Sequence, residues 1–182
     1  SALTRPVSFK LERNKKVAVR GVNGWGKTTL LKTILGMIPP FAGTIRQGDF
    51  LQPGYFEQEE RVKNEKTALE DVWDAYPGLT NAEVRAALAG CGLTNEHITT
   101  KVFVLSGGEA AKVRLCKLML QEVNWLVLDE PTNHLDVEAK EELKKAIIEF
   151  KGSVLLVSHE PEFYEDWIDE VWNIEDWTTK II

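Results

Sequence analysis

The strongest chemical signal in the sequence is a run of nine residues, Gly21, Val22, Asn23, Gly24, Trp25, Gly26, Lys27, Thr28 and Thr29. The run fits the pattern G-x-x-x-x-G-K-[ST], in which glycines let backbone N–H groups wrap a phosphate. The lysine adds positive charge, and the hydroxyl of Thr28 can bind Mg²⁺. An apolar run at 16–19 predicts a buried strand before the loop, and helical spacing of apolar residues follows it. This order places a phosphate on a helix dipole and disfavours the alternative, a glycine-rich turn without a ligand.

A second motif, Leu-Val-Leu-Asp-Glu at 126–130, joins an apolar run to two acids. A buried strand that ends in an acid is where open α/β sheets place their ligands. We predict that Asp129 holds Mg²⁺ opposite Thr28 and that Glu130 orients or deprotonates an attacking water. The alternative is an acidic pair that only opens a loop, which the upstream phosphate loop disfavours.

A third motif, Ser106, Gly107, Gly108 and Glu109, precedes a stretch of helical periodicity that reaches Leu120. Ser106 and Glu109 fit a capping box, so the motif can be explained as a helix start alone. Two glycines in a first turn cost helix stability, however, and they suit a ligand that approaches the backbone closely. Spacing does not decide between these two interpretations.

Two single residues are weaker candidates. His159 follows an apolar run at 154–157, where it could donate to a terminal phosphate or position water. Gln58 follows a short predicted strand and could reach Mg²⁺ or the same water. A structural histidine and an ordinary loop glutamine are the alternatives.

The composition is that of a globular protein, with 43% hydrophobic and 27% charged residues among 182. No apolar run approaches the ~18 residues that cross a bilayer, and no signal peptide is visible. The net charge of −6 argues against a broad nucleic-acid surface. Cys91 and Cys116 are interpreted as reduced core thiols, with a metal site or a disulfide as alternatives. The chain begins without Met, which indicates a fragment of a longer protein.

Alternating periodicities predict an α/β fold with a largely parallel sheet covered on both faces. The strands are expected at 7–11, 16–19, 42–46, 48–56, 125–128, 154–157 and 171–174. Helices are expected at 67–76, 81–90, 110–120, 137–150 and 162–167. Thr67 with Glu70 and Thr80 with Glu83 are candidate capping boxes for the first two of these helices. The stretch from about 59 to 120 contains no strong strand signal and is interpreted as a helical insert.

In their order, these motifs resemble the full set of an ATP-binding cassette (ABC) domain: Walker A loop, Q-loop, signature, Walker B and switch histidine. The resemblance covers roughly residues 7–175. The segment 130–136, with a signature that ends in Glu109, resembles the ABC-F subfamily more than transporter cassettes. The implied fold is one P-loop NTPase cassette over residues 1–182, with the helical subdomain at 59–120 and a small antiparallel β part.

The resemblance also implies ATP and Mg²⁺ as cofactors and assigns roles to the residues. Glu130, His159 and Gln58 would be catalytic, and Thr28, Gln58 and Asp129 would bind the metal. The signature residues 106–109 would contact ATP held by a facing second cassette, and Asp136 would communicate across that dimer. Residues 21–29 would bind the nucleotide.

Three features depart from the family pattern. Trp25 stands where the family usually has a small residue, and we expect its indole to point away from the phosphates. No aromatic residue that could stack on adenine is visible before Val7, which predicts weak affinity for the base. The RNA-binding arm and the long linker are not found in this sequence, so the chain is expected to be the second cassette of a tandem protein.

The resemblance implies a soluble, cytoplasmic ATPase module of a ribosome-associated ABC-F protein, acting in translation or antibiotic resistance. One alternative is the ATPase subunit of a membrane ABC transporter, which needs a groove for a membrane partner that the sequence does not show. Another is a nucleotide-sensing scaffold with little turnover. Intact Lys27, Asp129, Glu130 and His159 count against the scaffold.

Overall fold

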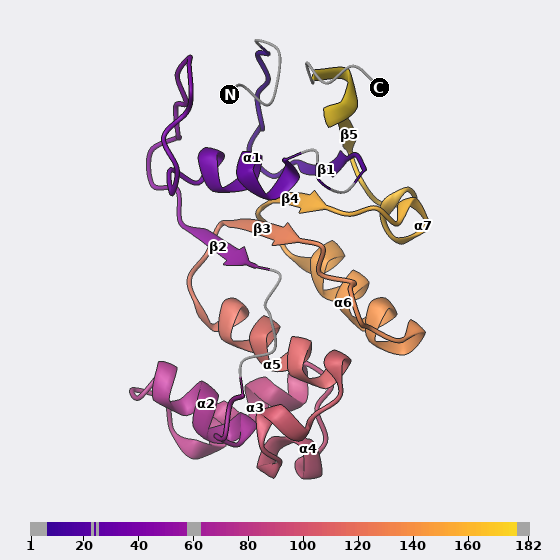
Figure 1. Ribbon diagram of the computed structural model, residues 1–182. Helices are drawn as coiled ribbons and strands as arrows, with labels where there is room; N and C mark the ends of the chain where they lie inside the picture. Colours follow the sequence, from indigo (N-terminus) through magenta and orange to yellow (C-terminus); the bar gives the residue numbers. More distant parts are fainter. Residues whose placement is uncertain (1–6, 23, 25, 58–62, 178–182) are drawn as a thin grey trace. The chain divides into compact units, whose positions relative to one another are not determined.

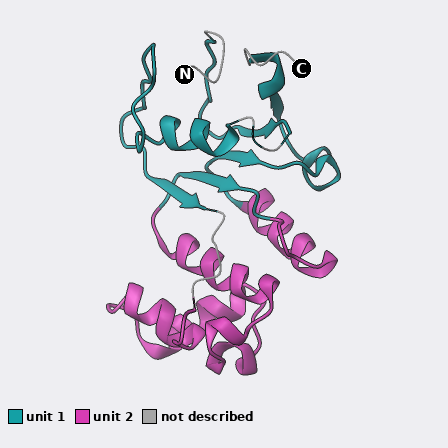
Figure 2. Ribbon diagram, viewed as in Figure 1, with its two compact units in different colours: residues 1–57, 123–131, 150–182 teal, residues 58–122, 132–149 magenta. Residues whose placement is uncertain are grey.

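The chain divides into two compact units, each described by itself (Figure 2). Unit 1 comprises residues 1–57, 123–131 and 150–182, and unit 2 comprises residues 58–122 and 132–149. The structure is a computed structural model that describes residues 7–22, 24, 26–57 and 63–177. Each unit has its own hydrophobic cluster of buried side chains.

In the described part of unit 1, five strands form one parallel sheet in the order β2-β3-β4-β1-β5 (Figure 1). The strands are β1 (Lys16–Arg20), β2 (Pro53–Phe56), β3 (Trp125–Asp129), β4 (Ser153–Val157) and β5 (Glu170–Asn173). Every residue of β3 and β4 is buried, as the continuous apolar runs in their sequences predict. Because all the strands are parallel, their C-terminal ends lie at one edge of the sheet, where the predicted motifs begin.

Helix α1 (Lys27–Ile34) covers one face of this sheet. Its fully buried Leu31 packs in a cluster with alternate residues of the central strands, Val17, Val19, Val127, Leu155 and Val157. The period-two alternation of strand side chains explains why these residues share a face. The described part of unit 1 also contains two short helical segments, α7 (Pro161–Tyr164) and η2 (Ile174–Trp177), and Ile174 joins the same cluster.

Two predicted strands are not formed. Residues 7–11 and 42–46 have no strand structure, and β2 begins at Pro53 rather than at residue 48. Among the described residues, antiparallel pairing is limited to an isolated bridge between Thr67 and Lys101, so the expected small antiparallel part is not seen as a sheet. Val7 is 37% exposed and Ile45 42% exposed, and a strand needs a paired, half-buried surface to be stable. The parallel α/β core itself agrees with the prediction.

The described part of unit 2 is helical. Its elements are α2 (Ala68–Ala75), α3 (Asn81–Gly90), α4 (Asn95–Thr99), η1 (Val102–Val104), α5 (Gly107–Leu120) and α6 (Val137–Glu149). The capping boxes predicted at Thr67, Thr80 and Ser106 are all present. A fourth capping box, formed by Thr94 and His97, lies at the N-terminus of α4. The sequence did not predict this short helix, because histidine at the third position is not the usual Glu or Gln of the motif.

Both cysteines belong to the hydrophobic cluster of unit 2 and are free thiols. Cys116 is buried in the cluster, and Cys91 packs against it. A hydrogen bond between the two thiols lowers the pKa of Cys91 and, together with burial, raises the pKa of Cys116. The interpretation of the two residues as core thiols agrees with this packing.

None of the helices in the described ranges combines the length and the apolar character that crossing a bilayer requires.

Candidate active site

The phosphate loop of unit 1 connects β1 to α1. Gly24 and Gly26 have φ angles of 82° and 88°, in the left-handed region that glycine adopts without a steric penalty. Gly26 is the N-cap of α1, and no described side chain caps the helix there. The first turn of α1 also contains no acidic residue. Its backbone N–H groups and the positive end of its dipole are therefore suited to an anionic ligand.

Lys27 is buried beneath this loop, with its side chain 7% exposed. Its Nζ donates a hydrogen bond to the carbonyl oxygen of Gly21 at 2.5 Å and lies 3.8 Å from Oε1 of Glu130. A buried ammonium group is costly unless it is paired, and here the two oxygens supply that pairing. The lysine therefore lies between the glycine loop and the acid that follows β3.

Thr28 and Asp129 bring two hard oxygen ligands together. The Thr28 hydroxyl donates to Oδ2 of Asp129 at 2.7 Å. Burial raises the pKa of Asp129, and the charge of Glu130 acts in the same direction, whereas the Thr28 hydrogen bond and Lys27 oppose the shift. Mg²⁺ in nucleotide sites takes one or two such protein oxygens and completes its shell with phosphate and water. The pair fits that requirement.

Glu130 and His159 meet where β3 and β4 end. The N–H of Glu130 donates to the carbonyl oxygen of Val157 at 2.9 Å, which extends the parallel pairing by one residue. Oε2 of Glu130 lies 2.7 Å from Nδ1 of His159 and accepts from the His159 N–H at 3.4 Å. The φ of Glu130 is 49°, a left-handed conformation that costs a residue with a Cβ about 1–2 kcal/mol. Such strain concentrates at functional sites.

The second carboxylate oxygen of Glu130 has a different environment. Oε1 is buried and has no hydrogen-bond partner among the described residues. The ammonium nitrogen of Lys27 lies 3.8 Å from it. A buried acceptor without a hydrogen bond is destabilising, so this oxygen is a natural place for a water molecule or a ligand to bind.

Tyr55 is a residue of this region that the sequence did not single out. It pairs with Val127 across β2 and β3, so Asp129, two residues further along β3, projects from the same face. Burial, followed by the charges of Asp129 and Glu57, raises the pKa of Tyr55. Only the strand register reveals this proximity, because nothing in the local sequence distinguishes Tyr55 from a core aromatic.

Unit 2 contains the signature segment, residues 106–109. Ser106 caps α5: its Oγ accepts from the Glu109 N–H at 3.2 Å, and Oε2 of Glu109 accepts from the Ser106 N–H at 2.8 Å. A Cβ added at Gly108 would lie 3.1 Å from the Cβ of Ala139 in α6. The structure therefore gives Gly108 a packing role, because a side chain at this position would crowd α6.

Asp136 also lies in unit 2, at the start of α6. Its Oδ1 accepts a hydrogen bond from the Ala139 N–H at 2.8 Å, so the side chain caps this helix. The structure thus groups Lys27, Thr28, Asp129, Glu130 and His159 in unit 1. The signature segment and Asp136 belong to unit 2. The predictions for Asn23, Trp25 and Gln58 fall on residues outside those described.

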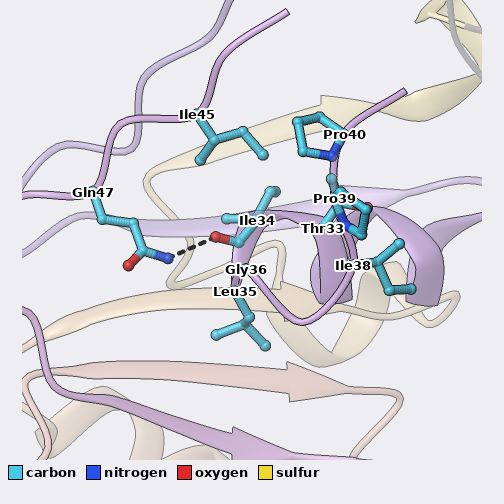
Figure 3. A pocket seen from close by; sticks show the side chains of 9 residues that line it. All are labelled: Thr33, Ile34, Leu35, Gly36, Ile38, Pro39, Pro40, Ile45 and Gln47. Carbon is cyan, nitrogen blue, oxygen red and sulfur yellow. Dashed lines mark hydrogen bonds between the residues drawn. The ribbon is translucent and has the colours of Figure 1, made fainter. Parts of the chain in front are cut away.

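A surface pocket of unit 1 is separate from this cluster (Figure 3). It lies at the C-terminal end of α1, the end opposite the phosphate loop, and includes Ile34, Pro39 and Ile45. Gln47 closes one side of it by donating from Nε2 to the carbonyl oxygen of Ile34 at 2.9 Å. The pocket has no titratable side chain in its lining, so it adds no chemistry to the candidate site.

The sequence profile of the family described as ABC transporter matches residues 4–133. An uncharacterized ABC transporter ATP-binding protein of Bacillus subtilis, YfmM, is 58% identical over the whole chain, which spans 35% of that relative. ABC transporter F family member 5 of Arabidopsis thaliana is 40% identical over 96% of the chain and 26% of its own length. The chain thus spans between a quarter and about a third of these relatives.

Two solved structures support the fold. A putative ABC transporter ATP-binding protein from Pyrococcus furiosus superposes with a TM-score of 0.83 at 24% identity, over 98% of this chain and 94% of its own. The archaeal ribosome recycling factor aABCE1, solved in complex with the ribosomal stalk protein aP1, gives a TM-score of 0.71 at 27% identity. That match covers 90% of this chain and 32% of the recycling factor. The chain therefore belongs to the ABC transporter family as a single ATP-binding cassette, with ABC-F proteins among its homologues.

Proposed function

We propose that this cassette binds Mg²⁺–ATP at the phosphate loop of unit 1 and hydrolyses its terminal phosphate. The observation that carries the proposal is Oε1 of Glu130, a buried carboxylate oxygen without a hydrogen-bond partner among the described residues and 3.8 Å from Lys27. A water molecule that donates to this oxygen would be oriented by a base whose other oxygen is already held by His159.

In this proposal the loop residues 21–29 hold the phosphates of ATP through backbone N–H groups, and Lys27 contributes its charge. Lys27 would exchange its hydrogen bond with Gly21 for a phosphate oxygen. Thr28 and Asp129 would hold Mg²⁺, with Gln58 as a further ligand. The metal, when bound, neutralises charge on the phosphate oxygens. Glu130 acts as the base. His159 would hold the Glu130 carboxylate through its Nδ1–H and, as an imidazolium ring with a second N–H, would donate toward the terminal phosphate from Nε2.

We further propose that each site is completed by a second cassette. The Ser106 hydroxyl and the backbone N–H groups of Gly107 and Gly108 would contact the terminal phosphate bound by the facing cassette, and Asp136 would lie at the contact. ATP then holds the two cassettes together and hydrolysis releases them. The capped N-terminus of α5, which carries two glycines, supports this role because it offers backbone donors at a positive helix end.

For the parent protein, we propose a cytoplasmic ABC-F factor that acts at the ribosome in translation or antibiotic resistance. The ABC-F relative and the fold match to a ribosome recycling factor support this choice. The competing role is an ATPase subunit of a membrane transporter. Sedimentation of the full-length protein with ribosomes supports the first role, and recovery in the membrane fraction supports the second.

The direct test of the chemistry is Glu130→Gln, which keeps the size of the side chain and removes the base. Turnover should fall about 10²–10⁴-fold, the contribution of a general base, while ATP binding is retained. In the presence of ATP, the variant should then accumulate as a dimer, which analytical ultracentrifugation detects. Glu12→Gln, an exposed acid that precedes the N-terminal end of β1, is the matched control. If Glu130→Gln hydrolyses ATP as fast as the parent, Glu130 is not the base.

A further inference from the structure

We infer that His97 is a positioning residue for the signature segment, because its imidazole joins the capping box of α4 to the capping box of α5. His97 lies outside every motif that sequence analysis singled out. All the groups involved belong to unit 2. The functional part of the inference rests on the proposed role of Ser106 toward the ATP of a facing cassette.

The α4 capping box fixes the proton on the His97 ring. Thr94 Oγ1 accepts from the His97 N–H at 3.3 Å, and the Thr94 N–H donates to Nδ1 of His97 at 3.3 Å. Because Nδ1 accepts a hydrogen bond, the neutral ring must carry its proton on Nε2. The backbone of α4 therefore sets both the orientation and the tautomer of this imidazole.

The proton-bearing nitrogen faces the signature segment. His97 Nε2 lies 3.3 Å from Oε1 of Glu109, whose other oxygen, Oε2, accepts from the Ser106 N–H at 2.8 Å. Each oxygen of the carboxylate thus has a nitrogen beside it: the Ser106 N–H donates to Oε2, and His97 Nε2 lies within ion-pair distance of Oε1. The side chains of His97 and Glu109 are 30% and 28% exposed, so water screens their contact less than it screens a fully exposed pair.

This arrangement leaves Ser106 ready to donate. Ser106 Oγ already accepts from the Glu109 N–H at 3.2 Å, so its own hydroxyl proton is left for another acceptor. A terminal phosphate is such an acceptor. The carboxylate of Glu109 lies in the same first turn of α5 and would repel that phosphate. The contact with His97 keeps this carboxylate on the Ser106 N–H, and this limits the repulsion. His97 therefore acts on the phosphate contact through Glu109, without touching the nucleotide.

Two variants separate this role from simple capping of α4. His97→Gln offers a carbonyl oxygen to the Thr94 N–H and an amide N–H to Glu109, so it replaces both functions of the ring. His97→Glu keeps an acceptor for Thr94, and Glu is the usual capping-box residue, but it presents a second negative charge to Glu109. If His97 only caps α4, the two variants behave alike.

The contact itself is tested without nucleotide, by amide hydrogen exchange. Exchange at Ser106 and Glu109 should be faster in His97→Glu than in the parent by about fivefold, the scale of one partly exposed charge pair. His97→Gln should stay close to the parent. Equal exchange at Ser106 and Glu109 in both variants overturns the inference, whatever the result with ATP. Thermal unfolding of both variants controls for loss of α4.

The functional consequence is tested in the Glu130→Gln background, where ATP-dependent dimers are expected to accumulate. His97→Glu should weaken this association by about fivefold or more, and His97→Gln should leave it at the level of Glu130→Gln alone. The ATP affinity of the phosphate loop should be the same in both variants. Equal association of both variants overturns the role of His97 at the phosphate. If Glu130→Gln itself binds ATP and never associates, the facing-cassette proposal fails instead, and the exchange result still decides whether His97 holds Glu109.

Discussion

Replacing Gly21 with alanine should destabilise unit 1 through packing, before any effect on phosphate binding. A Cβ at position 21 would lie 2.2 Å from Cγ2 of Ile174, a fully buried residue of the sheet cluster. Carbon atoms in contact are about 3.5–4.0 Å apart, so the methyl groups must separate by more than an ångström. Overpacking of this kind costs about 1–3 kcal/mol. In a chain of this size the unfolding midpoint should therefore fall by roughly 2–12 °C.

Two substitutions at position 174 test whether this clash is the cause. Ile174→Leu removes the branch at Cβ, and with it the Cγ2 atom, while it conserves volume. Ile174→Val keeps both γ carbons and is the matched control. Thermal unfolding of Gly21→Ala, of each Ile174 variant and of the two double variants gives the coupling between the positions.

We expect Ile174→Leu to recover most of the stability lost in Gly21→Ala, and Ile174→Val to recover little. Calorimetry with Mg²⁺–ATP should then show that the Gly21→Ala/Ile174→Leu variant binds the nucleotide as the parent does. If Gly21→Ala is as stable as the parent, or if both Ile174 substitutions rescue it equally, the packing explanation for Gly21 is wrong.

Two further predictions concern carboxyl groups, and both are measured by urea unfolding without Mg²⁺. Burial raises the pKa of Asp129, so ionisation of this carboxyl group destabilises the folded state, and stability is lost as pH rises above the ordinary carboxyl pKa. Asp129→Asn should therefore be more stable than the parent at neutral pH. A less stable variant contradicts this prediction. The pH dependence of Glu70 has the opposite sign, since hydrogen bonds from Thr67 lower its pKa. The parent should exceed Glu70→Gln in free energy of unfolding by the full amount at about pH 7, and this difference should shrink as pH falls to about 3.5. A difference that does not depend on pH refutes the prediction.

Local patterns predicted the core of the fold because they reflect local physics. The apolar runs at 16–19, 125–128 and 154–157 became buried parallel strands, since a strand covered on both faces needs continuous hydrophobicity. The capping boxes at Thr67, Thr80 and Ser106 formed because their hydrogen bonds span only three residues.

Features that depend on distant partners were missed or wrong. Residues 7–11 and 42–46 alternate as strands do, and alternation alone does not supply the neighbouring strand that pairing requires. The Glu109–His97 contact, the proximity of Tyr55 to Asp129 and the close approach of Gly21 to Ile174 each join residues of different segments, which no local sequence pattern connects. The left-handed backbone of Glu130 also has no local signal, because glutamate rarely adopts it.

Lys27 lies at the centre of the proposed site, between the carbonyl of Gly21 and the carboxylate of Glu130. Isothermal titration calorimetry of the chain with Mg²⁺–ATP, beside Lys27→Met, measures whether this lysine belongs to a phosphate site. We predict saturable binding at one site per chain and its loss in Lys27→Met. Undetectable binding by the parent, or equal binding by the variant, contradicts the proposed phosphate site.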